Sequence, residues 1–187
     1  SAFPENQEES QKLVFSLLMD SPAVVIFDNL TSDLLPYTSL CSALTEESIQ
    51  GRILGVSKTA RVGTKTFFLS SGNNVGPVKD MTRRTVVICL NPQIELASER
   101  DFKFDPLSMV KSRRSHYVSL VLTVINAWLA SGRPMTNCRK LASYERWSEL
   151  SRQPLMWLGV SDPAAGLYSV QENDPEKQML MRLLLAW

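Results

Sequence analysis

Two apolar runs of the sequence end in small polar side chains that could take part in phosphate chemistry. The run Val24–Phe27 is followed by the pair Asp28-Asn29, and the run Thr66–Leu69 is followed, after a serine- and glycine-containing turn, by the pair Asn73-Asn74. Continuous apolar, β-prone runs of this length are typical of buried parallel strands. Ligands of open α/β sheets bind beyond the carboxyl ends of such strands. A carboxylate and amides at these ends therefore predict a site for a metal-bound phosphate.

The charged side chains are divided unequally along a chain whose net charge is only +1. Residues 1–50 contain eight acidic and one basic side chain, whereas residues 51–90 contain seven basic and one acidic side chain. A local excess of positive charge favours an anionic partner. The same excess would arise if the basic segment were a solvated face beside the acidic one, and charge alone does not decide between these interpretations.

Size and composition predict one domain, or one domain with an appendage, from 187 residues that are 44% hydrophobic and 21% charged. No apolar run is long enough to span a bilayer and no secretory signal is recognised, so we expect a cytoplasmic protein that does not enter the membrane. Cys41, Cys89 and Cys138 are predicted to be buried free thiols. The single histidine, His116, has no cysteine near it in the sequence, which excludes a zinc-finger spacing.

Helices and strands are expected to alternate in the first hundred residues, as in an α/β fold. Polar residues and glycine between two strand-like runs predict a hairpin with a basic tip. The expected elements are a helix over 4–19, a strand over 24–27, a helix over 30–44, hairpin strands over 52–56 and 65–69, and a third buried strand over 85–90.

Only helices are expected after this point. Asp105-Pro106 is a strong helix start, because the carboxylate caps the first turn and proline suits it. That helix should run to about Ala130 and end at Gly132, followed by shorter helices over 143–151 and from Asp174-Pro175 onward. The change in character predicts two domains, an α/β part over 1–102 and a helical C-terminal subdomain over 103–187.

Several motifs occur along the chain in a recognisable order. They are Val25–Leu30, Arg52–Gly55, Ser71–Asn74, Asp80–Arg84, Arg113-Arg114 and Pro154–Gly159. Taken together, these motifs are similar to the back half of the ATPase core of phage and mobile-element primase–helicase proteins, which are AAA+-type NTPases related to superfamily-three helicases. The resemblance implies a partial AAA+-like P-loop NTPase fold, with a mostly parallel sheet, flanking helices and an all-helical end.

The resemblance implies roles at the predicted phosphate site. Asp28 would be the Walker B acid that holds Mg²⁺, usually through water. Asn29 stands where many AAA+ proteins have a catalytic glutamate, so the identity of the base is open. Asn73 or Asn74 would be the sensor amide beside the γ-phosphate or the attacking water. If these residues have no such role, Asp28-Asn29 could cap a following helix and Asn73-Asn74 could form a plain turn.

The resemblance also implies roles for basic residues. Arg83 or Arg84 would be an arginine finger that reaches a neighbouring subunit's site in a homo-oligomer such as a hexamer. Lys58, Arg61 and Lys65, on the predicted hairpin, would hold single-stranded or forked DNA through its phosphates. Ordinary surface charge is the alternative for both groups.

No G-x-x-x-x-G-K-[ST] phosphate loop occurs in the sequence. We therefore expect the chain to be the C-terminal part of an ATP- and Mg²⁺-dependent DNA helicase or primase-associated ATPase that acts in bacterial or phage DNA replication. Alone, it should neither bind ATP tightly nor hydrolyse it. The alternative function is a non-enzymatic module that binds nucleic acid or a partner and has lost its ATPase signature.

Overall fold

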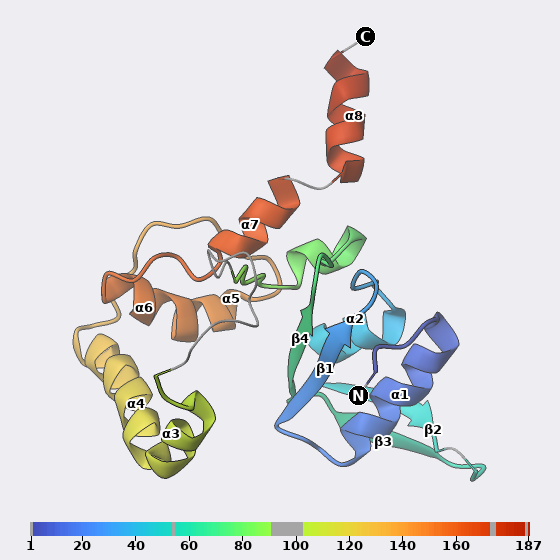
Figure 1. Cartoon of the computed structure of the whole chain (residues 1–187), viewed down its shortest axis with the longest axis horizontal. Coiled ribbons are helices and arrows are strands. Elements are labelled where there is room, and N and C mark those ends of the chain that lie inside the picture. Colours follow the sequence, from blue (N-terminus) through green and yellow to red (C-terminus); the bar gives the residue numbers. More distant parts are fainter. Residues whose placement is uncertain (1, 54, 91–102, 173–174, 186) are drawn as a thin grey trace. The chain divides into compact units, whose positions relative to one another are not determined.

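The computed structural model describes residues 2–53, 55–90, 103–172, 175–185 and 187 of the chain. It is a mixed α/β structure with two compact units, one formed by Ser1–Val87 with Leu167–Trp187 and the other by Ile88–Gly166 (Figure 1). We call these unit 1 and unit 2 and describe each by itself. None of the described helices combines the length and apolar character that a bilayer-spanning segment needs.

Unit 1 contains all the described strands. Its first helix, α1, is capped by Asn6, whose side chain accepts a hydrogen bond from the Glu9 backbone N–H. In chain order the elements are α1 (Gln7–Met19), β1 (Val24–Leu30), α2 (Thr38–Thr45), β2 (Ser48–Arg52), β3 (Thr59–Gly63), β4 (Phe67–Gly72) and the 3-10 helix η1 (Lys79–Arg83).

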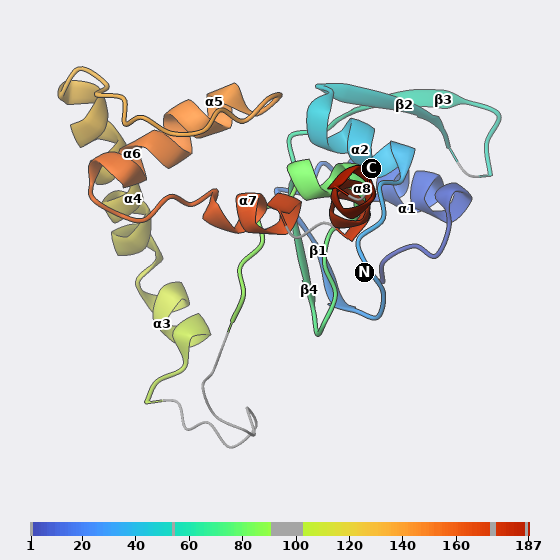
Figure 2. The ribbon, with the colours of Figure 1, turned by 90° about the horizontal axis from the view of Figure 1, so that it is seen from above.

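Strands β1 and β4 pair in parallel, from Val24 opposite Phe67 onward, and lie side by side in both views (Figures 1 and 2). Their inner face carries Val25 and Phe27, which are 5% and 1% exposed, and packs against Val14 and Leu18 of α1 and Leu40 of α2. The apolar runs predicted over 24–27 and 66–69 are thus confirmed as strands. Their parallel pairing brings their carboxyl ends to one edge.

Strands β2 and β3 form a separate antiparallel hairpin, in which Gln50 lies opposite Arg61. The predicted hairpin exists, but its strands were placed too late in the sequence. Residues 48–52 pair with residues 59–63, whereas the segment predicted as the second hairpin strand, 65–69, leads into β4 and pairs with β1. Apolar content decided the predicted boundaries, whereas the observed strand contains the polar Gln50 and Gly51, which pair with Arg61 and Ala60 of β3.

Three further predictions for unit 1 and its border are wrong. The helix expected over 30–44 begins only at Thr38, because β1 continues through Leu30 and an isolated parallel bridge joins Leu34 to Pro77. The segment 85–90 is not a strand, and Ile88 is 80% exposed, so the parallel sheet has only two strands within the described residues. Cys89 on this segment is exposed rather than buried.

Unit 2 is helical. The helix expected from Pro106 to Ala130 is broken at Arg113, where φ is −119° and ψ is 26°, but its predicted cap is confirmed, since Asp105 accepts hydrogen bonds from two backbone N–H groups. Gly132 follows with a φ of 82°, as its position after the helix predicts. The helices of unit 2 are α3 (Pro106–Ser112), α4 (Arg114–Ala130), α5 (Glu145–Trp147), the π-helical η3 (Ser148–Arg152) and α6 (Gln153–Trp157). Two helices follow in the chain, α7 (Ala165–Glu172) and α8 (Pro175–Leu185), and from Leu167 onward they belong to unit 1.

Polar side chains organise the interior of unit 2. Arg152 is 0% exposed and forms a two-pronged pair with Asp162, through Nε–Oδ1 and Nη2–Oδ2 distances of 2.7 and 2.5 Å. Its Nη1 donates to the Arg139 carbonyl at 2.8 Å. Gln153 both accepts from the Thr136 N–H and donates to the Thr136 carbonyl. Two neighbouring helical residues therefore fix the loop that follows α4.

Candidate functional site

The carboxyl end of β1 contains a bulge at the predicted catalytic pair. Phe27 lies opposite Ser70 and Leu30 lies opposite Gly72, so β1 takes three steps where β4 takes two. Asn29 has a φ of 57°, in the left-handed region, which asparagine enters more easily than most residues. The extra residue restores Leu30, 8% exposed, to the core-facing side. Bulges of this kind often re-aim a side chain beside a functional site.

Ser71 of β4 closes the bulge from the neighbouring strand. Its hydroxyl donates a hydrogen bond to Asp28 Oδ1 and accepts one from the Asn29 backbone N–H at 3.2 Å. The two strand ends therefore meet through side chains, as the sequence predicts, but the group that faces Asp28 is a hydroxyl. We call Asp28, Asn29 and Ser71 the strand-end cluster. All three are exposed.

The loops beyond the two strands run alongside each other. Leu34 N–H donates to the Gly76 carbonyl at 2.9 Å, Val78 N–H donates to the Leu34 carbonyl at 3.3 Å, and Gly76 N–H donates to Asp33 Oδ1 at 3.0 Å. Gly72 lets the chains approach closely, because a Cβ atom there would lie 2.5 Å from Val75 Cγ2 and 3.0 Å from the Leu30 carbonyl oxygen. These contacts fix the rim on which the predicted sensor amides stand.

The predicted sensor residues, Asn73 and Asn74, follow Gly72 directly and are exposed on this rim. Asn74 has a φ of 54°, so the backbone there uses the left-handed conformation that a turn needs. The backbone of Asn73 is not in the left-handed region. A turn conformation therefore does not account for asparagine at this position. The interpretation of Asp28-Asn29 as a helix cap is wrong, because no helix begins at this point.

Sequence reasoning did not single out Ser71 or Asp33 as partners at this edge. Ser71 lies in the polar residues that follow the second apolar run, as Asp28 lies in those that follow the first. Only the parallel pairing of the two strands and the bulge in β1 show that these two residues meet. Asp33 lies in the helix that was expected over 30–44, but α2 begins only at Thr38.

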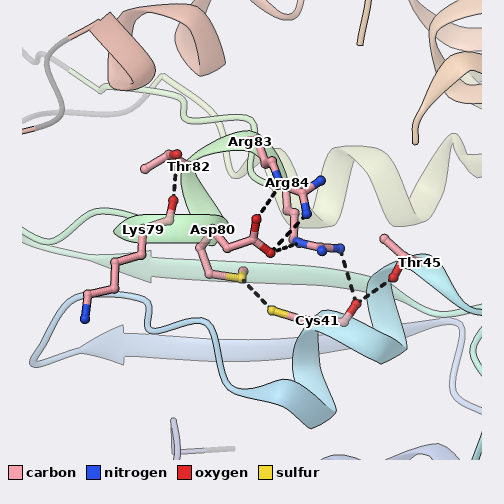
Figure 3. Close-up of polar contacts among 8 residues, drawn as sticks. Cys41, Thr45, Lys79, Asp80, Thr82, Arg83 and Arg84 are labelled. Carbon is pink, nitrogen blue, oxygen red and sulfur yellow. Dashed lines mark hydrogen bonds and ion pairs between the residues drawn. The ribbon is translucent and has the colours of Figure 1, made fainter. Parts of the chain in front are cut away.

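The two predicted arginine-finger candidates are held by one carboxylate, as Figure 3 shows. Asp80 accepts hydrogen bonds from Nε of Arg83 and, at 2.7 Å, from Nε of Arg84. The hydrogen bond from Arg83 and, to a smaller extent, that from Arg84 lower the pKa of the Asp80 carboxyl from its ordinary value. The Asp80 carboxyl is therefore ionised at neutral pH beside the two guanidinium groups.

Their surroundings separate the two arginines. The Arg84 side chain is 10% exposed and its Nη1 lies 3.4 Å from the carbonyl oxygen of Cys41 in α2. This contact and the bond to Asp80 hold Arg84 against unit 1. The Arg83 side chain is 45% exposed. Of the two, Arg83 is the one with a guanidinium that a second molecule can reach.

The three predicted nucleic-acid-binding residues do not all lie on the hairpin. Arg61 is in β3 and donates from Nε to Ser48 Oγ at 2.7 Å, and Lys58 lies in the turn between β2 and β3. Lys65 lies beyond β3, before β4 begins. The register places Arg52 on the same face as Arg61, so the basic face of the hairpin contains Arg52 and Arg61, and Lys58 stands in the turn at its tip.

The described residues contain no group of three or more histidine, cysteine, aspartate or glutamate side chains that could hold a metal by themselves. The strand-end cluster offers one carboxylate and one hydroxyl. Mg²⁺ bound to nucleotide needs no more than this from a protein, because waters and phosphate oxygens supply its other ligands. The cluster fits a nucleotide-bound Mg²⁺ and does not fit a free-standing metal centre.

Comparison with known proteins adds no relative to this picture, since no family model, curated protein or solved structure matches the chain.

Substitution of Asn29 tests whether its amide is needed for backbone conformation. Asn29→Ala is expected to lower the free energy of unfolding of unit 1 by about 1 kcal/mol, because alanine resists the left-handed region. Asn29→Gly should change it by only a few tenths of a kcal/mol, since glycine adopts this conformation readily. Urea unfolding followed by far-UV circular dichroism measures both. Equal effects of the two substitutions would show that backbone strain does not select Asn29.

Proposed function

We propose that the carboxyl edge of β1 and β4 belongs to the nucleotide site of an AAA+-type ATPase, as part of a DNA helicase or primase-associated motor. The observation that supports this most is the direct hydrogen bond between Asp28 and Ser71, at the ends of adjacent parallel strands. That edge is where α/β sheets bind their ligands. The phosphate loop absent from the sequence would have to come from another polypeptide segment.

The chain's residues have separable tasks under this proposal. Bound Mg²⁺·ATP would supply an activated phosphoryl group with partly neutralised charge. Asp28 would orient the metal's water ligands, and the Ser71 hydroxyl would hold that carboxylate in one rotamer. Asn73 would present its amide to the terminal phosphate from the rim. Asn29 would hold the bulge, so a proton acceptor for the attacking water must come from elsewhere.

A motor of this kind acts as a homo-oligomer, for which a hexamer is the expected form. Arg83 would enter the neighbouring subunit's site, while Asp80 and Arg84 hold it at the surface. The basic face of the hairpin would contact the phosphates of single-stranded or forked DNA. In this setting the protein would work in the bacterial cytoplasm, in replication of a phage or mobile element.

A second function is favoured by one specific observation. The left-handed backbone at Asn29 gives this residue a conformational reason to be asparagine, and its amide cannot act as a general base. The chain could then be a non-enzymatic module that binds nucleic acid through Arg52, Lys58 and Arg61. The coding sequence upstream of Ser1 separates the two functions, since a G-x-x-x-x-G-K-[ST] loop there supports the motor and an unrelated domain supports the module.

Titration of the chain with Mg²⁺·ATP, followed by NMR chemical shifts, tests the proposed site. Binding should be weak, with a dissociation constant of about 1 mM or higher, because the phosphate loop is absent. Asp28→Asn should weaken it about tenfold by removing the metal-directed carboxylate. Asp20→Asn is the matched control, because Asp20 is an exposed acid that precedes β1 at its other end. Equal effects of the two substitutions would overturn the proposal.

A further inference from the structure

A cleft of about 330 Å³ opens between α1, α2 and β2. One stripe of each helix lines it, because residues four positions apart lie on the same side of a helix. The lining includes Gln7, Gln11 and Phe15 on α1, and Ser42 and Glu46 on and just after α2. Among the described residues that line the cleft, Glu46 is the only one with a charged side chain. This composition suits a ligand that donates hydrogen bonds rather than an anion.

The frame of the cleft is fixed by contact between the two helices. Gln7 Oε1 accepts a hydrogen bond from the Thr38 backbone N–H at 3.0 Å, which ties the start of α1 to the start of α2. By contrast, the side chains of Gln11, Ser42 and Glu46 have no hydrogen-bond or ion-pair partner in the part of the chain that the structure describes. Three acceptor groups are therefore free in a cleft that is already formed, which lowers the cost of binding.

The outer edge of β2 borders the same cleft, with Gln50 and Gly51 in its wall. Ile53 N–H donates to the Lys58 carbonyl, and antiparallel pairing alternates, so the odd-numbered residues of β2 bond to β3. The backbone N–H and C=O groups of Gln50 and Arg52 therefore point away from β3. Among the described strands β2 pairs with β3 alone, which leaves these groups available to another strand.

Gly51 shows which face of an added strand would enter the cleft. A Cβ atom on Gly51 would lie 2.6 Å from Cδ2 of the Phe15 ring, so this face of β2 looks toward α1. Side chains directly opposite each other on neighbouring strands share a face. In a strand added antiparallel to β2, the residue opposite Gly51 therefore projects toward the helices, while its two neighbours bond to Gln50 and Arg52. Because Gly51 has no side chain, the cleft stays open for that residue.

The chemistry of the cleft selects a cationic side chain at this position. Glu46 supplies a carboxylate, and Gln11 and Ser42 supply an amide oxygen and a hydroxyl. All three accept hydrogen bonds, and a guanidinium group offers five N–H donors and no acceptor. Charge agrees with this assignment, because residues 1–50 contain eight acidic and one basic side chain. An apolar residue would cover these acceptors without offering a donor, and an acidic residue would meet the like charge of Glu46.

We propose that the outer edge of β2 binds an extended peptide segment of a partner protein, which pairs antiparallel with Gln50 and Arg52 and places an arginine in the cleft against Glu46. Main-chain hydrogen bonds then supply affinity and the cleft supplies specificity, as in other cases of strand addition. This contact uses only α1, α2 and β2. It is independent of the nucleotide site proposed at the ends of β1 and β4, and it holds whether or not that site exists.

A capped pentapeptide tests the proposal on the full chain. Its central arginine has threonine on either side and valine at both ends, and a second peptide has glutamate in place of arginine. NMR titration should give a dissociation constant on the order of 0.1 mM for the arginine peptide, and binding at least about tenfold weaker for the glutamate peptide. Hydrogen exchange should slow at the amides of Gln50 and Arg52, and not at Gly51, which already bonds to β3. Methylation of both threonine nitrogens should remove this protection, because it removes the donors to β2.

Two matched pairs of variants test the cleft itself. Glu46→Gln should weaken binding of the arginine peptide about tenfold by removing the facing carboxylate. Glu47→Gln, the same change at the next residue and outside the lining, should have little effect. Gln11→Lys should weaken binding by at least about tenfold, because it places a like charge in the cleft. Ser16→Lys adds the same charge at an exposed position of α1 outside the lining and should leave binding unchanged.

Several results would overturn the proposal. They are absence of binding, equal binding of the arginine and glutamate peptides, equal effects within either pair of variants, and protection that falls outside β2. Slower exchange at Gln50 and Arg52 that follows protein concentration alone would overturn it as well, since a second copy of the chain would then occupy the edge.

Discussion

Arg152→Met is expected to lower the free energy of unfolding of unit 2 by about 3 kcal/mol. The side chain of Arg152 is fully buried and donates to Asp162 and to the Arg139 carbonyl. Methionine fills similar volume but donates no hydrogen bond, so it leaves a partly buried carboxylate and a carbonyl without this partner. Few single substitutions cost as much, since typical values are about 1 kcal/mol.

Tryptophan fluorescence during urea unfolding measures this effect in unit 2. Three of the four tryptophans lie in unit 2, namely Trp128, Trp147 and Trp157. The fourth, Trp187, is the last residue of the sequence and belongs to unit 1. Arg133→Met is the matched control, because the Arg133 side chain is 59% exposed and its nearest contact to Glu149 is 3.4 Å. That variant should lose less than about 1 kcal/mol. A similar small loss for Arg152→Met would show that the buried pair does not hold unit 2 together.

The same pair gives unit 2 a pH dependence with a definite sign. The hydrogen bond from Arg152 lowers the pKa of Asp162 from its ordinary value. The contribution of the ion pair to the free energy of unfolding is therefore complete above the pKa that Asp162 has in the unfolded chain. It is lost as pH falls through the lower pKa that Asp162 has in the folded chain. Wild-type unit 2 should lose this part of its stability on acidification, and Arg152→Met should lack that part of the loss.

Gly72→Ala is expected to destabilise unit 1 by about 2 kcal/mol. The added methyl group would lie 2.5 Å from Val75 Cγ2 and 3.0 Å from both Cβ and the carbonyl oxygen of Leu30. The Val75 side chain can move aside, but the Leu30 carbonyl belongs to β1, so relief requires the strands to separate at the site. Asn73 and the strand-end cluster would then shift together.

Gly76→Ala is the control for this substitution, because a Cβ atom there meets nothing within 4 Å. Its N–H bond to Asp33 survives the change, so stability should stay within about 0.5 kcal/mol of the wild type. Far-UV circular dichroism in urea compares the two, and Gly72→Ala should also weaken Mg²⁺·ATP binding. Equal stability of the two alanine variants would mean that β1 and β4 are not held at this separation.

The sequence predicts the elements of this fold where one physical signal dominates. The runs 24–27 and 66–69 were recognisable as strands because they are apolar on both faces, and Asp105 because its carboxylate caps a helix. The strand 48–52 was missed because its polar residues become a strand only through pairing with β3. Residues 85–90 show the reverse case, since β-branched side chains favour a strand that finds no partner in the described chain.

The candidate site was predictable in outline and not in its contacts. Parallel strands ending in Asp28 and in a polar turn placed the chemistry at one edge. The bulge at Asn29 could not be read from spacing, because it depends on Leu30 returning to the core. Likewise, the difference between Arg83 and Arg84 arises from the contact of Arg84 with the Cys41 carbonyl of α2, 43 residues away in the sequence.

The location of Mn²⁺·ATP on the chain tests the central claim most directly. Mn²⁺ replaces Mg²⁺ and broadens the NMR signals of nearby amides, so it reports position even when binding is weak. We predict selective broadening at Asp28, Asn29 and Ser71–Asn73, and its loss in Asp28→Asn with Asp20→Asn unchanged. Broadening centred elsewhere, or broadening at this edge that persists in Asp28→Asn, would contradict a nucleotide site at the ends of β1 and β4.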